Sequence, residues 1–197
     1  AGKASEIHLA DYLPANLSEL ARWIERHADA HDWRPFVRYT LQCEGVASPT
    51  ERQIREREEI TRAKITKLLR VDARHADPLG ERNGSRYGTV ISAYCADSAT
   101  GDRATWETFM QHIAGLVRPG GMFITAALRR CRRYLVGGKA FPSADVDEND
   151  LRAVLEPQFV CEGGSIEAWD LAEHESQGYT GIVLGWAQRS VQAAVGG

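Results

Sequence analysis

The sequence predicts an α/β protein in which helices flank a mostly parallel sheet, with an antiparallel strand at the C-terminal edge of that sheet. Short apolar runs typical of buried strands alternate with amphipathic stretches of helical spacing. The last two apolar runs follow one another without a helix between them, which indicates an antiparallel pair. With 197 residues, 43% of them hydrophobic, the chain fits one domain with a substantial core. We expect that domain to cover residues 1–189 and residues 190–197 to form a disordered tail.

The first half of the chain begins with a strand and a helix. Residues 6–11 form a mostly apolar run that ends in an acid, and Pro14 and Asn16 mark the turn into an amphipathic stretch at residues 17–24. Residues 51–70 are rich in charged side chains, with apolar residues close to helical spacing. We interpret them as one solvated surface helix, with a binding role as the alternative.

The second half shows a more regular βαβ pattern. A buried strand is predicted at residues 87–95 and a helix at 105–117, with Trp106, Phe109, Ile113, Leu116 and Val117 facing inward. Arg118-Pro119-Gly120-Gly121 then stops the helix and leads into a strand at residues 122–128. The remaining expected elements are a loop at 129–144, a helix that begins between 144 and 150 and runs to about 156, and strands at 159–169 and 179–188.

Charge and cysteine content exclude several classes of partner. The net charge of −3 and the pI near 6.1 give no overall attraction to nucleic acid or to an acidic membrane, so we expect a small-molecule partner and a monomer or weak homodimer. No apolar stretch approaches the roughly 20 residues that span a bilayer. The cysteines show neither CxxC pairing nor interleaved His spacing. These features predict a cytoplasmic protein with reduced thiols and no metal site.

Acidic residues lie at two expected strand ends, one at the end of residues 6–11 and one at Val71-Asp72, which resembles the end of a further strand after the helix. In open α/β sheets, ligands collect at the carboxyl ends of the strands. Asp11 ends the first strand, and a carboxylate there commonly accepts hydrogen bonds from ribose hydroxyls. A turn or helix N-cap role before Pro14 is the alternative for Asp11. Asp72 gives a weaker signal of the same kind, and residues 92–97 also leave a strand end.

The Arg118-Pro119-Gly120-Gly121 turn resembles the motif that precedes the fifth strand of class I S-adenosylmethionine-dependent methyltransferases, whose fold is Rossmann-like. With that anchor, the chain resembles the family of nicotinamide, phenylethanolamine and thioether methyltransferases. The matching stretches are Asp11-Tyr12 with Asn16-Leu17, His31-Asp32-Trp33-Arg34-Pro35 leading to Val37 and Glu44-Gly45, Val71-Asp72, Ser92-Ala93-Tyr94-Cys95-Ala96-Asp97, the turn itself, and Gly185-Trp186-Ala187-Gln188-Arg189.

The resemblance implies a binding site for S-adenosyl-L-methionine, with S-adenosyl-L-homocysteine as the product. Asp11 would hold the ribose hydroxyls, Tyr12 would lie against the adenine, and Asn16 would contact the same nucleoside. Asp72 would accept from the adenine amino group, while the backbone N–H of Ala73 would serve a ring nitrogen.

The same resemblance assigns the end of the strand at residues 87–95 to the methionine part of the cofactor and to the acceptor. Ala93 and Cys95 would line the cofactor, and Tyr94 would face the acceptor. Asp97 matches the acid that positions the substrate amine in amine-methylating members, and it is the expected catalytic residue. Its alternative is an N-cap for the element that follows.

Two departures from the family are visible. The glycine-rich first motif, with its strand and N-terminal lid, would lie before Ala1, so we expect the chain to be part of a longer protein. Arginines also follow the strand at 122–128, where family members carry acidic or small polar residues. We expect Arg129, Arg130 and Tyr134 to bind the acceptor, because guanidinium groups suit a carboxylate, phosphate or sulfate. A solvated loop or a nucleic-acid patch is the alternative for the arginines at 129, 130, 132 and 133.

The predicted function is therefore methyl transfer to a small-molecule acceptor, favoured to be an amine nitrogen on a substrate with an anionic group. O-, S- or C-methylation in bacterial-type specialised metabolism is one alternative, and a degenerate fold that acts as a binding module is another. A nicotinamide-dependent oxidoreductase would also need an acid at a strand end. The early acid followed by the later Arg-Pro-Gly-Gly turn and the closing antiparallel strands argue against that class.

Overall fold

The computed structural model describes residues 4–80, 86–160, 166–171 and 176–191. The chain forms two compact units, residues 1–72 and residues 73–197. The expectation of one domain over residues 1–189 stays a prediction. Of the expected tail, all but Ser190 and Val191 lies outside the described residues.

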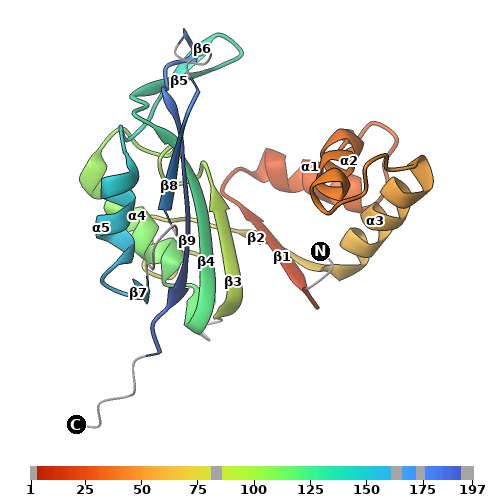
Figure 1. Cartoon of the computed structure of the whole chain (residues 1–197), viewed down its shortest axis with the longest axis horizontal. Helices are drawn as coiled ribbons and strands as arrows, with labels where there is room; N and C mark the ends of the chain where they lie inside the picture. Colours follow the sequence, from red (N-terminus) through yellow and green to blue (C-terminus); the bar gives the residue numbers. More distant parts are fainter. Residues whose placement is uncertain (1–3, 81–85, 161–165, 172–175, 192–197) are drawn as a thin grey trace. The chain divides into compact units, whose positions relative to one another are not determined.

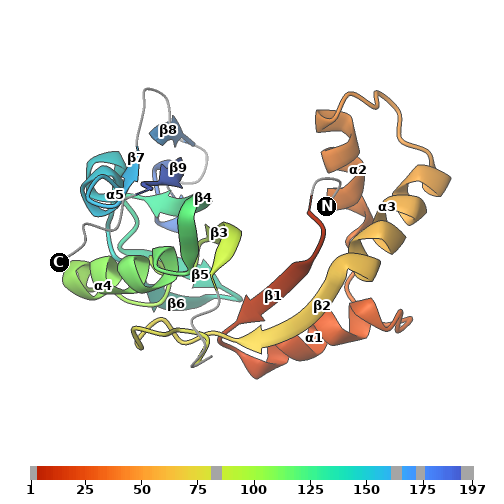
Figure 2. The ribbon, with the colours of Figure 1, turned by 90° about the horizontal axis from the view of Figure 1, so that it is seen from below.

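The first unit is built on a parallel pair of strands, β1 (Ile7–Asp11) and β2 (Ile65–Arg70). Helix α1 (Pro14–Ile24) runs along this pair (Figure 2) and begins with proline, whose fixed φ suits the first turn. Helices α2 (Arg34–Cys43) and α3 (Glu51–Lys64) complete the unit. The strand and helix predicted at the start of the chain are confirmed, whereas α2 was not anticipated.

The prediction of one helix over residues 51–70 is wrong at its C-terminal end. Helix α3 starts with a capping box, in which Thr50 and Gln53 each accept from the other's backbone N–H, but it ends at Lys64. The chain then continues directly as β2. Parallel pairing with β1 decides the boundary, because Leu68 and Leu69 lie opposite Leu9 and Ala10 in that ladder.

The second unit holds the larger sheet, and helices α4 and α5 lie together on one of its faces (Figures 1 and 2). Strand β4 pairs in parallel with β3 and antiparallel with β9, and β9 pairs on its other side with β7 and β8. The predicted α/β class is confirmed, and β7 with β8 forms the edge beyond the C-terminal strand. The bounds are β3 (Tyr87–Ala93), α4 (Arg103–Ala114), β4 (Val117–Arg129), α5 (Glu148–Leu155), β7 (Phe159–Val160), β8 (Ile166–Asp170) and β9 (Gly181–Arg189).

The core of this unit follows the predicted βαβ pattern. Trp106, Phe109 and Ile113 of α4 are buried, as are Val117 and Phe123 of β4. The Arg-Pro-Gly-Gly segment differs from its prediction, because it lies inside β4 as an irregularity in the pairing with β3. No helix among the described residues is long and apolar enough to cross a membrane.

The loop predicted at residues 129–144 instead contains a hairpin, β5 (Arg133–Val136) and β6 (Lys139–Pro142). Gly137 and Gly138 make its turn with φ of 57° and 79°, the left-handed conformation that two-residue hairpin turns require. The hairpin extends past the end of β4 (Figure 1). Sequence periodicity missed it because each strand has only four residues.

Gly178, just before β9, passes close to the base of this hairpin. Its φ is +102°, and a Cβ there would lie 2.0 Å from the carbonyl oxygen of Arg133. We therefore expect Gly178→Ala to lower the free energy of unfolding by about 3 kcal/mol or more, from backbone strain and steric overlap together. Urea denaturation measures this change.

Gly137→Ala is the matched control. Gly137 has φ of +57°, and a Cβ at this position would meet no other atom within 4 Å. Only the left-handed conformation is therefore penalised, by about 1–2 kcal/mol. Equal losses of unfolding free energy in the two variants would show that the backbone at Arg133 moves away from the added Cβ at little cost.

Candidate cofactor and acceptor site

The carboxyl end of β1 carries Asp11, the predicted ribose acceptor. Its Oδ1 accepts the backbone N–H of Leu13 at 2.8 Å, and its Oδ2 accepts the side-chain amide of Asn16 at 3.0 Å. The structure thus brings Asp11 and Asn16 together and shows the turn role that the sequence left open. A carboxylate offers about four lone-pair sites, so two donors leave room for hydroxyl donors as well.

Tyr12, which follows Asp11, keeps its ring accessible. The residue is 42% exposed, and the guanidinium of Arg70 lies 5.2 Å from its ring centroid. Arg70 belongs to the neighbouring strand β2, so the strand pairing sets this contact. A partly exposed aromatic ring at a strand end is suited to stacking against a flat heterocycle.

The predicted cofactor residues are divided between the two units. Asp72, which is half-buried, ends the first unit, and Ala73 begins the second. The Ala73 carbonyl oxygen lies 2.7 Å from Nδ1 of His112, a residue of α4. Both residues of this contact belong to the second unit.

The carboxyl end of β3 has an unusual backbone. Tyr94 is a non-glycine residue with φ of 52°, and its N–H still donates to the carbonyl of Ala126 on β4 at 2.8 Å. Ala93 and Cys95 on either side are exposed. Left-handed backbone at a residue other than glycine costs on the order of 1–3 kcal/mol and concentrates at functional sites. The three predicted residues are therefore presented together at this strand end.

Asp97, the predicted catalytic acid, is almost fully buried, with 1% of its surface exposed. Its Oδ2 accepts the backbone N–H of Leu128 at 2.9 Å, and its carbonyl accepts that of Ala144 at 3.1 Å. Burial raises the pKa of Asp97 to about 6, although hydrogen bonds from Leu128 and Ser98 act in the opposite direction. A carboxyl group with this pKa exchanges its proton near neutral pH.

The charge of Asp97 affects the pKa values of Tyr94 and Tyr134. Burial raises the pKa of each phenol, and the negative charge of Asp97 adds to the increase. The Tyr134 hydroxyl donates to the carbonyl oxygen of Ser98 at 3.1 Å, which joins the hairpin to the segment after β3. Tyr179 also raises the pKa of Tyr94, and sequence reasoning did not single it out.

Among the described residues, Arg129 at the end of β4 and Arg130 and Arg132 after it face carboxylates of the protein itself. Arg129 pairs with Glu148 through two hydrogen bonds of 2.8 and 3.0 Å and with Asp170 at 3.0 Å. Arg130 pairs with Asp147, and Arg132 pairs with Asp145 at 2.9 Å. The hydrogen bonds from Arg129 hold the pKa of Glu148 at about 2.

Sequence reasoning missed these acidic partners. Asp145, Asp147 and Glu148 precede or start α5, where Asp147 also caps the helix by accepting from the backbone of Asn149 and Asp150. Acids at such positions are read first as helix caps. One sequence feature could have indicated these ion pairs. The acids at residues 145–148 follow the arginines at residues 129–133 after a short segment.

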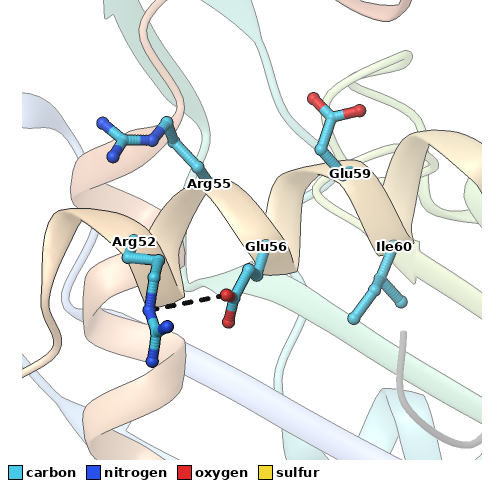
Figure 3. Close-up of a pocket in the computed structure, with 5 residues that line it drawn as sticks. All are labelled: Arg52, Arg55, Glu56, Glu59 and Ile60. Carbon is cyan, nitrogen blue, oxygen red and sulfur yellow. Dashed lines mark ion pairs between the residues drawn. The ribbon is translucent and has the colours of Figure 1, made fainter.

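Two surface hollows on the first unit involve none of the predicted residues. Glu19, Asp29, His31 and Trp33 line one of them. Figure 3 shows the other along α3, where Arg52 and Glu56 form an ion pair of 3.6 Å on the same side as Ile60. Arg52 is 80% exposed, which fits the solvated helix surface expected from the sequence. The second hollow is lined by Arg52, Arg55, Glu56, Glu59 and Ile60.

Sequence comparisons place this chain beside amine methyltransferases. It is 29% identical to mouse indolethylamine N-methyltransferase over 151 residues, covering 77% of this chain and 56% of that protein. It is 29% identical to human nicotinamide N-methyltransferase over 152 residues (76% and 55%) and 26% identical to phenylethanolamine N-methyltransferase of Macaca mulatta over 189 residues (93% and 65%). The chain thus spans between about half and two thirds of the length of these relatives.

Solved structures agree on the fold. The N-methyltransferase NodS from Bradyrhizobium japonicum superposes with a TM-score of 0.53 at 11% identity, covering 96% of this chain and 76% of that one. A SAM-dependent methyltransferase from Methanosarcina mazei gives 0.50 at 12% identity, covering 66% and 69%. The profile of the NNMT/PNMT/TEMT family matches residues 1–182, and this chain therefore belongs to the NNMT/PNMT/TEMT family.

Proposed function

We propose that the intact protein transfers a methyl group from S-adenosylmethionine to the nitrogen of a small-molecule amine. The observation that carries the proposal is Asp97, a buried carboxyl group with a pKa of about 6 behind the strained end of β3. An amine must lose a proton to remain neutral after methylation, and a carboxylate at this position is suited to receive it. The similarity to amine-methylating relatives supports the same reaction.

Residues of each unit, taken separately, have chemistry that supports binding of the cofactor. Asp11 retains acceptor capacity for ribose hydroxyls, Tyr12 offers an exposed ring for the adenine, and Ala93 and Cys95 are exposed at the end of β3. When bound, S-adenosylmethionine supplies a methyl group on an activated sulfonium, so no strong nucleophile is required of the protein. Tyr94 and Tyr134 would orient the acceptor, and Asp97 would take its proton.

A small-molecule methyltransferase of this kind would act in the cytoplasm as a monomer or weak homodimer. The acidic pI of about 6.1 supports a function that does not involve nucleic acid. Cys43 and Cys131, both in the described part of the chain, carry free thiols, which supports a reducing compartment.

Calorimetric titration of the intact protein with S-adenosylhomocysteine, followed by a methyl-transfer assay on a panel of small amines, tests the proposal. We expect binding, and turnover of at least one primary or secondary amine. Binding without turnover of any amine would favour the binding-module alternative. Absence of binding would overturn the proposal altogether.

A further inference from the structure

We propose that Arg129, Arg130 and Arg132 are positioning residues that fasten the base of the β5–β6 hairpin, rather than ligands for an anionic acceptor. Their effect on methyl transfer rests on the proposed function, whereas their effect on the hairpin does not. We call residues 129–132 and 143–148, together with the contacts between them, the charge zipper. All of its residues belong to the second unit.

The ion pairs of the charge zipper follow a regular reversed order. Arg129 pairs with Glu148, Arg130 with Asp147, and Arg132 with Asp145, so each step forward on one segment is a step back on the other. Backbone hydrogen bonds follow the same course. They join Arg130 N–H to the Val146 carbonyl at 2.9 Å, Asp145 N–H to that of Cys131 at 2.8 Å, and Ser143 N–H to that of Arg132 at 3.0 Å.

Arg129 is the most connected member. Its guanidinium bonds Glu148 with two parallel hydrogen bonds, the strongest geometry for this pair, and reaches Asp170 at the end of β8. Its carbonyl oxygen accepts the backbone N–H of Thr180 at 3.1 Å. One residue therefore ties the end of β4 to the start of α5, the end of β8 and the segment before β9.

Backbone conformation shows that the charge zipper is held under constraint. Arg130 and Asp145 both have positive φ, 53° and 52°, although neither is glycine. Cys131 between the arginines is fully buried, and burial raises the pKa of its thiol. A left-handed conformation at residues other than glycine persists only where several surrounding contacts hold the backbone in it.

The charge zipper positions the predicted acceptor side of the site. Ala144, inside it, donates its N–H to the Asp97 carbonyl, and Leu128, directly before Arg129, donates its N–H to the Asp97 carboxylate. Tyr134, two residues after Arg132, donates its hydroxyl to the Ser98 carbonyl. Loosening the zipper would therefore displace Asp97 and Tyr134 together.

Charge balance argues against an anion site. The three arginines face three acids of the zipper, and Asp170 adds a fourth carboxylate on Arg129. An anionic acceptor would have to displace Glu148 from a bidentate pair to reach Arg129. A carboxylate on the acceptor would also meet Asp147 and Glu148 as like charges.

A double-mutant cycle on Arg129 and Glu148 separates the two roles. The variants are Arg129→Gln, Glu148→Gln and the double variant. Arg152→Gln is the control, because among the described residues its ion pair is a surface pair with Glu156 at the C-cap of the same helix. The acceptors are phenethylamine and phenylalanine, matched amines that differ by one carboxylate.

We expect both single variants to lower kcat/KM by about tenfold for either amine, mainly through kcat, with the double variant no worse than the singles. Arg152→Gln should stay within about twofold of wild type. An anion site predicts a different pattern, in which Arg129→Gln harms only phenylalanine and Glu148→Gln improves it by freeing the guanidinium. That pattern would overturn the positioning role.

Hydrogen exchange supplies a readout that needs no turnover. The amides of Arg130, Ser143, Asp145 and Thr180 should exchange at least about tenfold faster in Arg129→Gln and in Glu148→Gln, and at the wild-type rate in Arg152→Gln. Unchanged exchange in both variants would refute the charge zipper. Faster exchange in a protein that methylates no amine would leave the zipper standing and remove the proposed function instead.

Discussion

Replacement of Asp97 by Asn is expected to lower kcat/KM for methyl transfer by about a hundredfold or more, for neutral and carboxylated amines alike. Asn has nearly the same shape and keeps an oxygen that can accept the Leu128 N–H, but it cannot receive a proton. The measurement is steady-state kinetics with saturating S-adenosylmethionine at pH 8.

The pH dependence gives an independent signature of the same residue. Because burial raises the pKa of Asp97 to about 6, wild-type kcat/KM should rise with pH through that value, and Asp97→Asn should lack this limb. The folded-state pKa lies above the ordinary value of 3.8, so the stabilisation from the neutral acid is fully present below about pH 3.8 and lost as the pH rises through 6. The loss amounts to roughly 3 kcal/mol, and urea denaturation of the Asn variant should not show it.

Asp102→Asn is the control for this experiment. Asp102 caps α4 by accepting the Thr105 N–H at 2.8 Å, and Asn caps helices about equally well, so activity and stability should stay close to wild type. If Asp97→Asn changed stability but left kcat/KM and its pH profile intact, Asp97 would be a structural acceptor for Leu128 and not a catalytic residue.

Asp11→Ala is expected to weaken binding of S-adenosylhomocysteine by ten- to a hundredfold. Hydrogen bonds to a charged group contribute about 1.5–3 kcal/mol, which corresponds to that range of affinity. Isothermal titration calorimetry measures the change, and circular dichroism with urea denaturation reports whether the first unit remains folded.

The turn role of Asp11 requires its own control. Asn16→Ala removes the amide that Asp11 accepts at 3.0 Å, and Asp11→Asn keeps an oxygen for the Leu13 N–H but loses the charge. We expect Asp11→Asn to fold like wild type and still bind about tenfold more weakly. Wild-type affinity in a folded Asp11→Ala would remove Asp11 from the cofactor site and leave it as a turn residue.

Helical periodicity allowed the βαβ core of the second unit to be predicted. The spacing of Trp106, Phe109 and Ile113 places one face of α4 inward, and all three are buried. Short apolar runs located β1, β3 and β9, and their alternation with helical stretches predicted the α/β class. The boundary at Lys64 was missed because charged and apolar residues continue across it, and only the pairing of β2 with β1 converts the second part to strand.

Part of the candidate site could also be predicted, because strand ends are sequence features. Asp11 and residues 93–97 follow buried runs and stand at the carboxyl ends of β1 and β3. Their chemistry could not be predicted in the same way. The pKa of Asp97 depends on burial and on the Leu128 N–H, which comes from a strand about thirty residues later in the chain.

The sequence by itself determined the alternation of strands and helices, the acids at the strand ends and the membership of the family, since each depends on residues close together in the chain. Only the tertiary structure showed which groups the arginines at residues 129–132 pair with. In sequence alone, a run of arginines is equally consistent with an anion site, a solvated loop or ion pairs within the protein. The reason is that the sequence does not tell which negative groups lie near the run in space. The fold brings Asp145, Asp147 and Glu148 against that run and so selects the internal partners.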